Sequence, residues 1–133
     1  MAFKVMQRAF AALSPDGPPE RRSITVRTAF RGPGARDGFE AVTRAVFDGR
    51  YVVDRSLVRP DLGRLREDFV FVVTVGDRTA TLLLRDSFVT DEFVDLARAE
   101  NRTEAQEQQL DALKAKLAQR VMATPAADVY DVG

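Results

Sequence analysis

The stretch Phe69-Val-Phe-Val-Val-Thr-Val75, followed by Gly76-Asp77-Arg78 and Thr79-Ala-Thr-Leu-Leu-Leu-Arg85, contains two β-rich runs joined by a short turn. This pattern predicts a β-hairpin, because Gly and Asp readily adopt the backbone angles of a tight turn. The first run is apolar on both faces, so both faces need to be covered. We therefore expect a central strand, or a strand with a helix on one face and a partner on the other.

The segments around the hairpin show the periodicities of helices and strands. Residues 2–13 predict a helix with an apolar stripe formed by Phe3, Met6, Phe10 and Leu13. Residues 23–30 alternate as a half-buried strand with a cationic outer face. Further helices are expected at 39–48, 90–100 and 103–122, and a further strand at 51–58.

These elements predict one α+β domain over residues 1–124. Its sheet is small and mainly antiparallel and is built around the hairpin at about 69–85, with helices packed on one face and a C-terminal helical pair. The last residues, 125–133, follow a Thr-Pro helix stop and are polar around a single tyrosine. We expect them to form a C-terminal tail.

The composition excludes much chemistry. The 133 residues include no Cys and no His, so the chain has no thiol nucleophile, no disulfide, no imidazole base and no usual zinc site. We therefore predict no enzymatic activity, no catalytic residues, no metal and no cofactor. The N-terminal apolar residues are interrupted by Lys4, Gln7 and Arg8, which argues against a signal-peptide core, and no run suggests a membrane span. A cytoplasmic or virion-associated protein is expected.

Two short motifs contain residues that could form a chemical site. Gly32, Gly34 and Gly38 lie between a predicted strand and a predicted helix, where backbone N–H groups can bind phosphate, but their spacing fits neither a dinucleotide fingerprint nor a P-loop. A flexible turn is the simpler interpretation. Asp91 and Asp95 share a helix face near the start of a predicted helix, where acids are expected for dipole reasons alone.

The formal net charge of zero hides an asymmetry. Residues 1–66 hold 13 Lys and Arg against 7 Asp and Glu, and residues 67–133 hold 7 against 13. Seventeen of the 20 cations are Arg, the residue best suited to bidentate contacts with carboxylate or phosphate. The basic half could therefore meet the acidic half of its own chain, another copy of the chain, or nucleic acid.

The arginines of the basic half are the candidate anion or nucleic-acid contacts. We expect several of them on an exposed strand face or in the segments beside it, near aromatic residues. The candidates are Arg21, Arg22, Arg27, Arg31, Arg36 and Arg50. No known nucleic-acid-binding motif accompanies them, and the pI of about 6.3 argues against a strong phosphate footprint.

The last long helix carries a narrow apolar seam, spaced by three and four residues. The seam consists of Leu110, Leu113, Leu117 and Val121. Its partner could be the helix at 90–100 or the same helix of another copy.

We accordingly expect a non-catalytic structural or interaction protein, a subunit of a homo-oligomeric or larger assembly with charge-complementary surfaces, by analogy a virion component. The alternatives are a nucleic-acid-binding accessory protein acting through the arginine-rich half, and a small regulator of another protein. No membrane partner or small-molecule substrate is indicated by the sequence.

Overall fold

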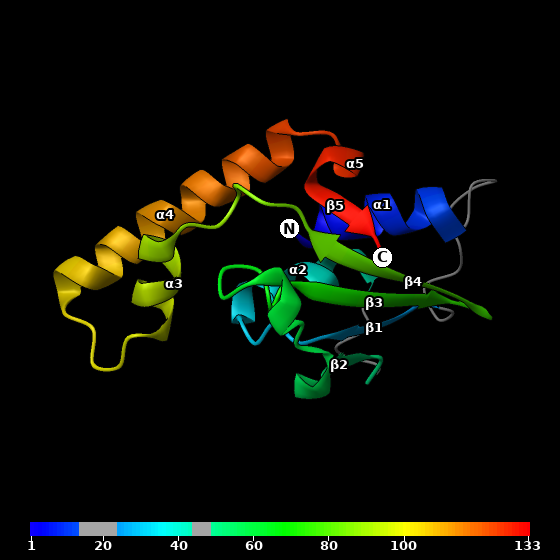
Figure 1. Ribbon diagram of the computed structural model, residues 1–133, viewed down its shortest axis with the longest axis horizontal. Coiled ribbons are helices and arrows are strands. Elements are labelled where there is room, and N and C mark those ends of the chain that lie inside the picture. Colours follow the sequence, from blue (N-terminus) through cyan, green and yellow to red (C-terminus); the bar gives the residue numbers. More distant parts are fainter. Residues whose placement is uncertain (14–23, 44–48) are drawn as a thin grey trace.

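The computed structural model describes residues 1–13, 24–43 and 49–133, and the side chains of residues 33, 34, 42 and 43 lie outside that description. Figure 1 shows a sheet with helices above and behind it, and a helical arm that projects to one side. The elements in chain order are α1 Ala2–Leu13, β1 Ile24–Thr28, α2 Pro33–Thr43, β2 Tyr51–Val53, η2 Arg55–Leu57, η3 Pro60–Leu62, β3 Val70–Val75, β4 Arg78–Leu84, α3 Asp91–Arg98, α4 Glu104–Ala123, α5 Ala126–Val129 and β5 Tyr130–Val132.

The hairpin is confirmed. β3 and β4 pair antiparallel from Val70 opposite Leu83 to Val75 opposite Arg78, which leaves a two-residue turn of Gly76 and Asp77. Gly76 has φ of 62°, the positive angle that a type II′ hairpin turn requires at its first central residue. The local chemistry of the turn therefore sets the register of the whole hairpin.

β3 is the central strand of the sheet, as its two apolar faces predict. The strand order is β2-β1-β3-β4-β5. β1 pairs antiparallel with β3 and parallel with β2, while β5 pairs antiparallel with β4. The observed fold is thus α+β with a mixed, mainly antiparallel sheet, in agreement with the prediction.

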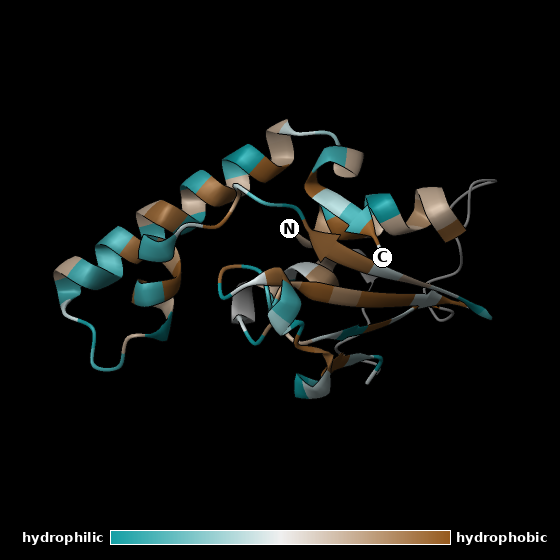
Figure 2. Ribbon diagram, in the orientation of Figure 1, coloured by the Kyte–Doolittle hydropathy of each residue, from teal (hydrophilic) through white to brown (hydrophobic). Residues whose placement is uncertain are grey.

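The inner face of the sheet forms the core together with α1 and α2. Phe71 is fully buried there; its ring centroid lies 5.7 Å from that of Phe39 in α2 and 5.9 Å from that of Tyr130 in β5. Burying aromatic rings of this size supplies much of the apolar free energy of a small domain. Figure 2 shows the hydropathy pattern, with hydrophobic stretches along β3 and β4.

The buried face of α1 differs from the predicted stripe. Met6 and Leu13 are buried as expected, but Phe3 is 50% exposed and Phe10 is only half-buried. The core face instead uses Ala2, Val5 and Ala9 beside Met6 and Leu13. Small side chains let the helix approach the sheet closely, so they take the inward positions although the larger phenylalanines have more apolar area.

Two predicted boundaries are wrong. The loop expected before the second helix is already helical from Pro33, because proline is well suited to the first turn of a helix, where its missing N–H is not needed. The strand predicted over residues 51–58 ends at Val53, because the Asp54 side chain accepts a hydrogen bond from the Ser56 amide and starts a 3-10 turn. Residues 44–48 of the predicted helix lie outside the described residues.

The C-terminal residues do not form the separate tail we expected. Residues 126–133 contain α5 and β5, and β5 extends the sheet beside β4. Val129 and Tyr130 are fully buried, and the Gly133 amide donates to the carbonyl of Thr81. The segment is too short to show a periodic apolar pattern in the sequence, but its apolar residues hold it in the core.

No helix in the described residues is both long and apolar enough to span a bilayer.

The Tyr130 hydroxyl gives a first prediction. It is buried, and within the described chain it has no hydrogen-bond partner. Since an unpaired buried hydroxyl costs about 1–3 kcal/mol, Tyr130→Phe should leave the fold as stable as before or raise the free energy of unfolding by about 1 kcal/mol. Tyr130→Ala should lower it by about 3–5 kcal/mol. Urea unfolding at pH 7 measures both, with Val132→Ala at a 47% exposed position as the control.

Alkaline unfolding supplies a second test of the same group. Burial raises the pKa of the Tyr130 phenol above its usual value of 10.0. The folded chain therefore keeps a proton that the unfolded chain loses above pH 10, and stability present below that pH is lost as the pH rises. Tyr130→Phe should shift the alkaline unfolding midpoint upward. An unchanged midpoint would contradict the burial of this phenol.

Candidate functional site: a groove between the sheet and the helical arm

α3 and α4 pack against each other as an arm beside the sheet (Figure 1). In the seam of α4, Leu110 and Val121 are buried and Leu113 and Leu117 are half-buried against the core. Of the two partners that the sequence left open, α3 packs on α4 within the chain. The seam residues are therefore largely occupied in a single copy.

Side chains cap the ends of the two arm helices. The Thr90 side chain accepts a hydrogen bond from the Phe93 amide, and Thr103 forms a reciprocal capping box with Gln106. Arg102 donates to the carbonyls of Leu96, Ala97 and Ala99 at the end of α3. These contacts satisfy helix-end groups that would otherwise lack partners, and they fix the bend between α3 and α4.

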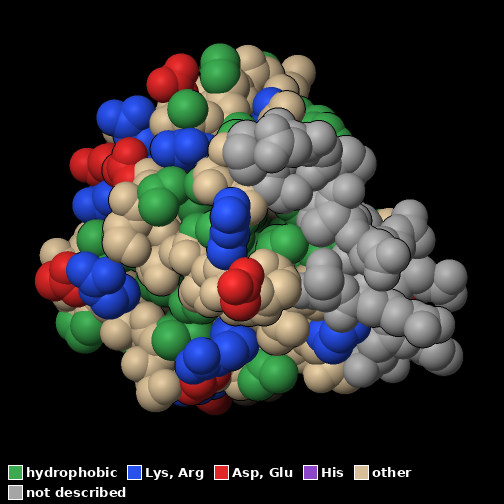
Figure 3. All heavy atoms as spheres, turned by 90° about the vertical axis from the view of Figure 1, so that its right-hand side faces the viewer, with side chains coloured by type: hydrophobic (Ala, Val, Ile, Leu, Met, Phe, Trp, Pro, Cys, Tyr) green, Lys and Arg blue, Asp and Glu red, His purple; other side chains and the backbone are tan. Residues whose placement is uncertain are grey.

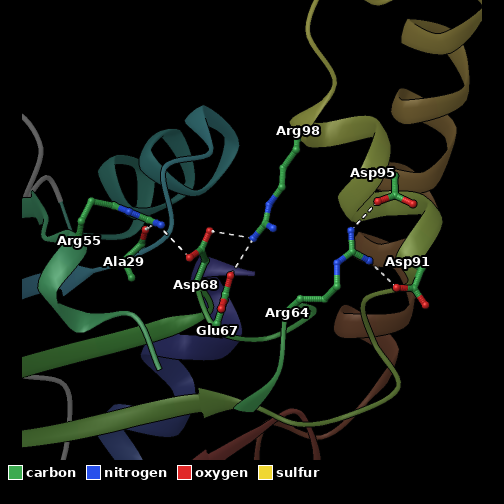
Figure 4. A network of polar contacts seen from close by, with 8 residues as sticks. All are labelled: Ala29, Arg55, Arg64, Glu67, Asp68, Asp91, Asp95 and Arg98. Atoms are coloured by element: carbon green, nitrogen blue, oxygen red, sulfur yellow. Dashed lines mark hydrogen bonds and ion pairs between the residues drawn. The ribbon is translucent and has the colours of Figure 1, made fainter. Parts of the chain in front are cut away.

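An arginine clamp joins the arm to the connector between β2 and β3 (Figure 4). Arg64 on the connector forms ion pairs with both Asp91 and Asp95 of α3. In the opposite direction, Arg98 of α3 bonds to Glu67 of the connector at 3.2 Å. The two carboxylates on one face of α3 thus bind an arginine of this chain.

The clamp continues toward the sheet. Arg98 also lies 3.8 Å from Asp68, and Asp68 lies 3.1 Å from the guanidinium of Arg55, which in turn donates to the Ala29 carbonyl after β1. The hydrogen bonds from Arg64 to Asp95 and Asp91 raise the pKa of the Arg64 guanidinium. Because these side chains are partly in water, the pairs are worth little individually and act mainly on the orientation of the arm.

A groove runs between the arm and the sheet domain. Its apolar part has a volume of about 470 Å³ and lies between the start of α1, α2 and the second half of α4. Small residues of α2, namely Ala35, Gly38 and Ala41, form part of one wall. A Cβ at Gly38 would come within 3.0 Å of the Ala2 side chain, so glycine permits the close approach of α1 and α2 that shapes this wall.

The groove continues into a second part with charged walls, of about 340 Å³. The two parts share Phe30, Gly32, Phe69, Phe93 and Lys114. Phe30 and Phe69 stack with ring centroids 4.6 Å apart and form an aromatic floor where the two parts meet. The cations Arg31, Arg64, Arg98, Arg102 and Lys114 line the second part, with Asp68 as the acid.

The described arginines predicted to contact anions make different contacts in the structure. Arg27 on β1 pairs with Asp54 at 3.0 Å, and Arg50 donates to the Ile24 carbonyl. Arg31 lines the groove, whereas Arg36 is exposed on α2. Burial raises the pKa of the Tyr51 phenol, and the nearby charge of Arg36 offsets a smaller part of that rise.

Arg21 and Arg22 lie outside the described residues. Figure 3 shows one face of the molecule, and basic and acidic side chains are interspersed over the described part of that face. Among the described candidates, Arg27 on β1 and Arg50 just before β2 belong to neighbouring strands, whereas Arg31 and Arg36 lie before and on α2.

Sequence reasoning missed the groove and the clamp. The i, i+4 spacing of Asp91 and Asp95 indicates that one cation can bind both carboxylates. The cation is the guanidinium of Arg64, which lies 27 residues from Asp91 in the sequence, so local spacing could not identify it. Phe93 lines the groove although it reads as an ordinary core position of its helix.

Among the described residues, no group of three or more Asp and Glu is placed to hold a metal ion. Comparison of the chain with protein-family models, with curated proteins and with solved structures found no match in any of the three.

The clamp predicts a local effect on the arm. Replacing Arg64 and Arg98 together by Gln should speed hydrogen exchange of the α3 amides and leave the amides of β3 and β4 unchanged, because only the arm loses contacts. The loss in global stability should be small, since all these pairs are largely exposed to water, which screens their charges.

Arg59→Gln is the matched control, because Arg59 pairs with Asp61 inside the connector and does not reach the arm. Equal acceleration of α3 exchange in the control, or none in the double variant, would show that the clamp does not orient the arm.

Proposed function

We propose that this protein is a non-catalytic subunit of a homo-oligomeric assembly, in which copies associate through the outer face of the sheet. The observation that carries the proposal is the apolar outer side of the central strands. Val72 of β3, Leu83 of β4 and Val52 of β2 all point to this side, by their register and by strand alternation.

The outer face is only partly covered by the described chain. α1 packs on β3 and β4 from the inner side, where the core residues lie. Ala29 and Val70, toward one end of the outer face, are buried next to the connector. Val72 and Leu83 are half-buried, and Val52 is 44% exposed. A strand with apolar residues on both faces is more stable when both are removed from water.

The composition of this face suits a contact between copies. The apolar residues share the face with Thr25, Thr74, Thr79 and Thr81, whose β-branched side chains pack well on a pleated surface, and with Arg27, which stands between Val52 and Val72 and pairs with Asp54. Such a face can stack on the same face of a second copy, as in aligned sheet packing about 10 Å apart, and a two-fold axis would make the contact self-complementary.

The charge pattern also favours protein contacts over nucleic acid. Arg64 and Arg55 of the basic half pair with Asp91, Asp95 and Asp68 of the acidic half within one copy. Since these arginines already have carboxylate partners within the copy, a nucleic-acid-binding role has less support. A mobility shift with single- and double-stranded nucleic acid at low salt tests that alternative.

Sedimentation velocity over a range of protein concentrations tests the proposal. The chain should sediment as an oligomer, and Thr79→Arg combined with Thr81→Arg should weaken self-association more than tenfold, because two added positive charges would lose water on the face that already carries Arg27. Both positions are at the surface, so the fold should survive, which near-UV circular dichroism checks.

Gln108→Arg combined with Ala112→Arg, both at exposed positions of α4, is the charge-matched control and should leave association unchanged. A chain that stays monomeric at all concentrations, or a double variant that associates as the parent does, would refute assembly through this face.

A further inference from the structure

We infer that the groove between the sheet domain and the arm is a binding site for an aliphatic carboxylate of the fatty-acid class. The inference concerns a different surface from the outer sheet face, since the lining residues belong to the N-terminal part of α1, to α2, to the arm and to the loops between them.

The size and lining of the apolar part fit an aliphatic chain. Its volume of about 470 Å³ lies within the range of small-molecule sites, which are concave and mostly apolar with a few polar groups at one end. Phe3, Phe93, Leu117 and Val121 contribute apolar surface. Phe3 is 50% exposed in the free chain, although it is one of the largest apolar side chains of α1. A ligand in the groove would cover part of that surface.

The side chains in the charged part of the groove indicate which head group a bound ligand would carry. Most of its cations are already engaged: Arg64 and Arg98 with carboxylates, and Arg102 with Glu107 and with carbonyls of α3. Arg31 and Lys114 are different, because within the described residues neither has an ion-pair partner, and both line this part of the groove. Lys114 also lines the apolar part, so it stands where the two parts meet.

This arrangement is complementary to an amphiphile with one negative charge. A carboxylate between Lys114 and Arg31 would accept charge-assisted hydrogen bonds, while the chain lies along the aromatic floor of Phe30 and Phe69 into the apolar part. A neutral head group would gain only weaker hydrogen bonds from these side chains, and a cationic head group would be repelled by them.

Isothermal titration calorimetry with dodecanoate, below its micelle-forming concentration, tests the site. We expect saturable 1:1 binding, with affinity rising about fourfold per methylene from decanoate to dodecanoate. Lys114→Gln should weaken binding about tenfold, and Ala118→Trp should abolish it by filling the groove from an exposed helix position.

Two control variants lie on the same helix. Lys116→Gln and Ala115→Trp change exposed residues that do not line the groove, and they should bind dodecanoate as the parent does. If they weaken binding equally, the ligand is not in the groove and the inference fails.

Two probes decide the head group. Dodecyltrimethylammonium and dodecanol should bind at least tenfold more weakly than dodecanoate. Equal affinities would identify an apolar groove without carboxylate recognition, and no binding of dodecanoate at all would mean that the groove receives something other than a fatty acid; either result overturns the inference. Sedimentation of the same variants keeps this outcome separate from assembly, because Lys114→Gln and Ala118→Trp leave the outer sheet face intact.

Discussion

The fold depends on the need to cover both faces of β3. A strand in which nearly every side chain is apolar is stable only where water is excluded above and below it. In this protein β1 and β4 complete its backbone hydrogen bonds, and the inner face buries Phe71 between Phe39 and Tyr130. The position of β5 follows from the same requirement, because its Tyr130 closes the core over Phe71 at the end of the chain. A single copy covers the outer face of β3 only in part.

The abundance of arginine has a structural explanation in this fold. Several arginines donate to backbone carbonyls at the first or last residue of a helix or strand: Arg78 bonds to the Leu13 carbonyl at the end of α1, Arg66 to the Leu84 carbonyl at the end of β4, and Arg50 to the Ile24 carbonyl at the start of β1. A guanidinium group has five donors and stays charged, so it can satisfy a carbonyl and a carboxylate together, as Arg55 does with Ala29 and Asp68. A basic half of a sequence therefore need not imply an anionic partner.

The parts of the fold that were predictable are those governed by local chemistry. The Gly76 turn, the capping box at Thr103 and the period-two alternation of β1 all follow from interactions within a few residues. The buried side of α1 was not predictable, because two overlapping apolar stripes were available and only the sheet selects between them. The groove was not predictable either. It exists because residues from α1, α2 and α4 meet across the fold, and because the arginine clamp holds the arm at that angle.

The two surfaces make different physical demands on the molecule. The outer sheet face is formed by backbone pairing in the most regular part of the fold, so it is rigid before any contact is made, and preorganisation of this kind lowers the entropic cost of association. The groove has one rigid wall, formed by α1 and α2, and one wall on the arm, which partly exposed ion pairs hold in place. Small changes in the clamp can therefore change the width of the groove while the sheet stays fixed. A ligand that fills the groove would in turn contact α3 and α4 together with the body of the domain, and would add to the free energy that keeps the arm in place.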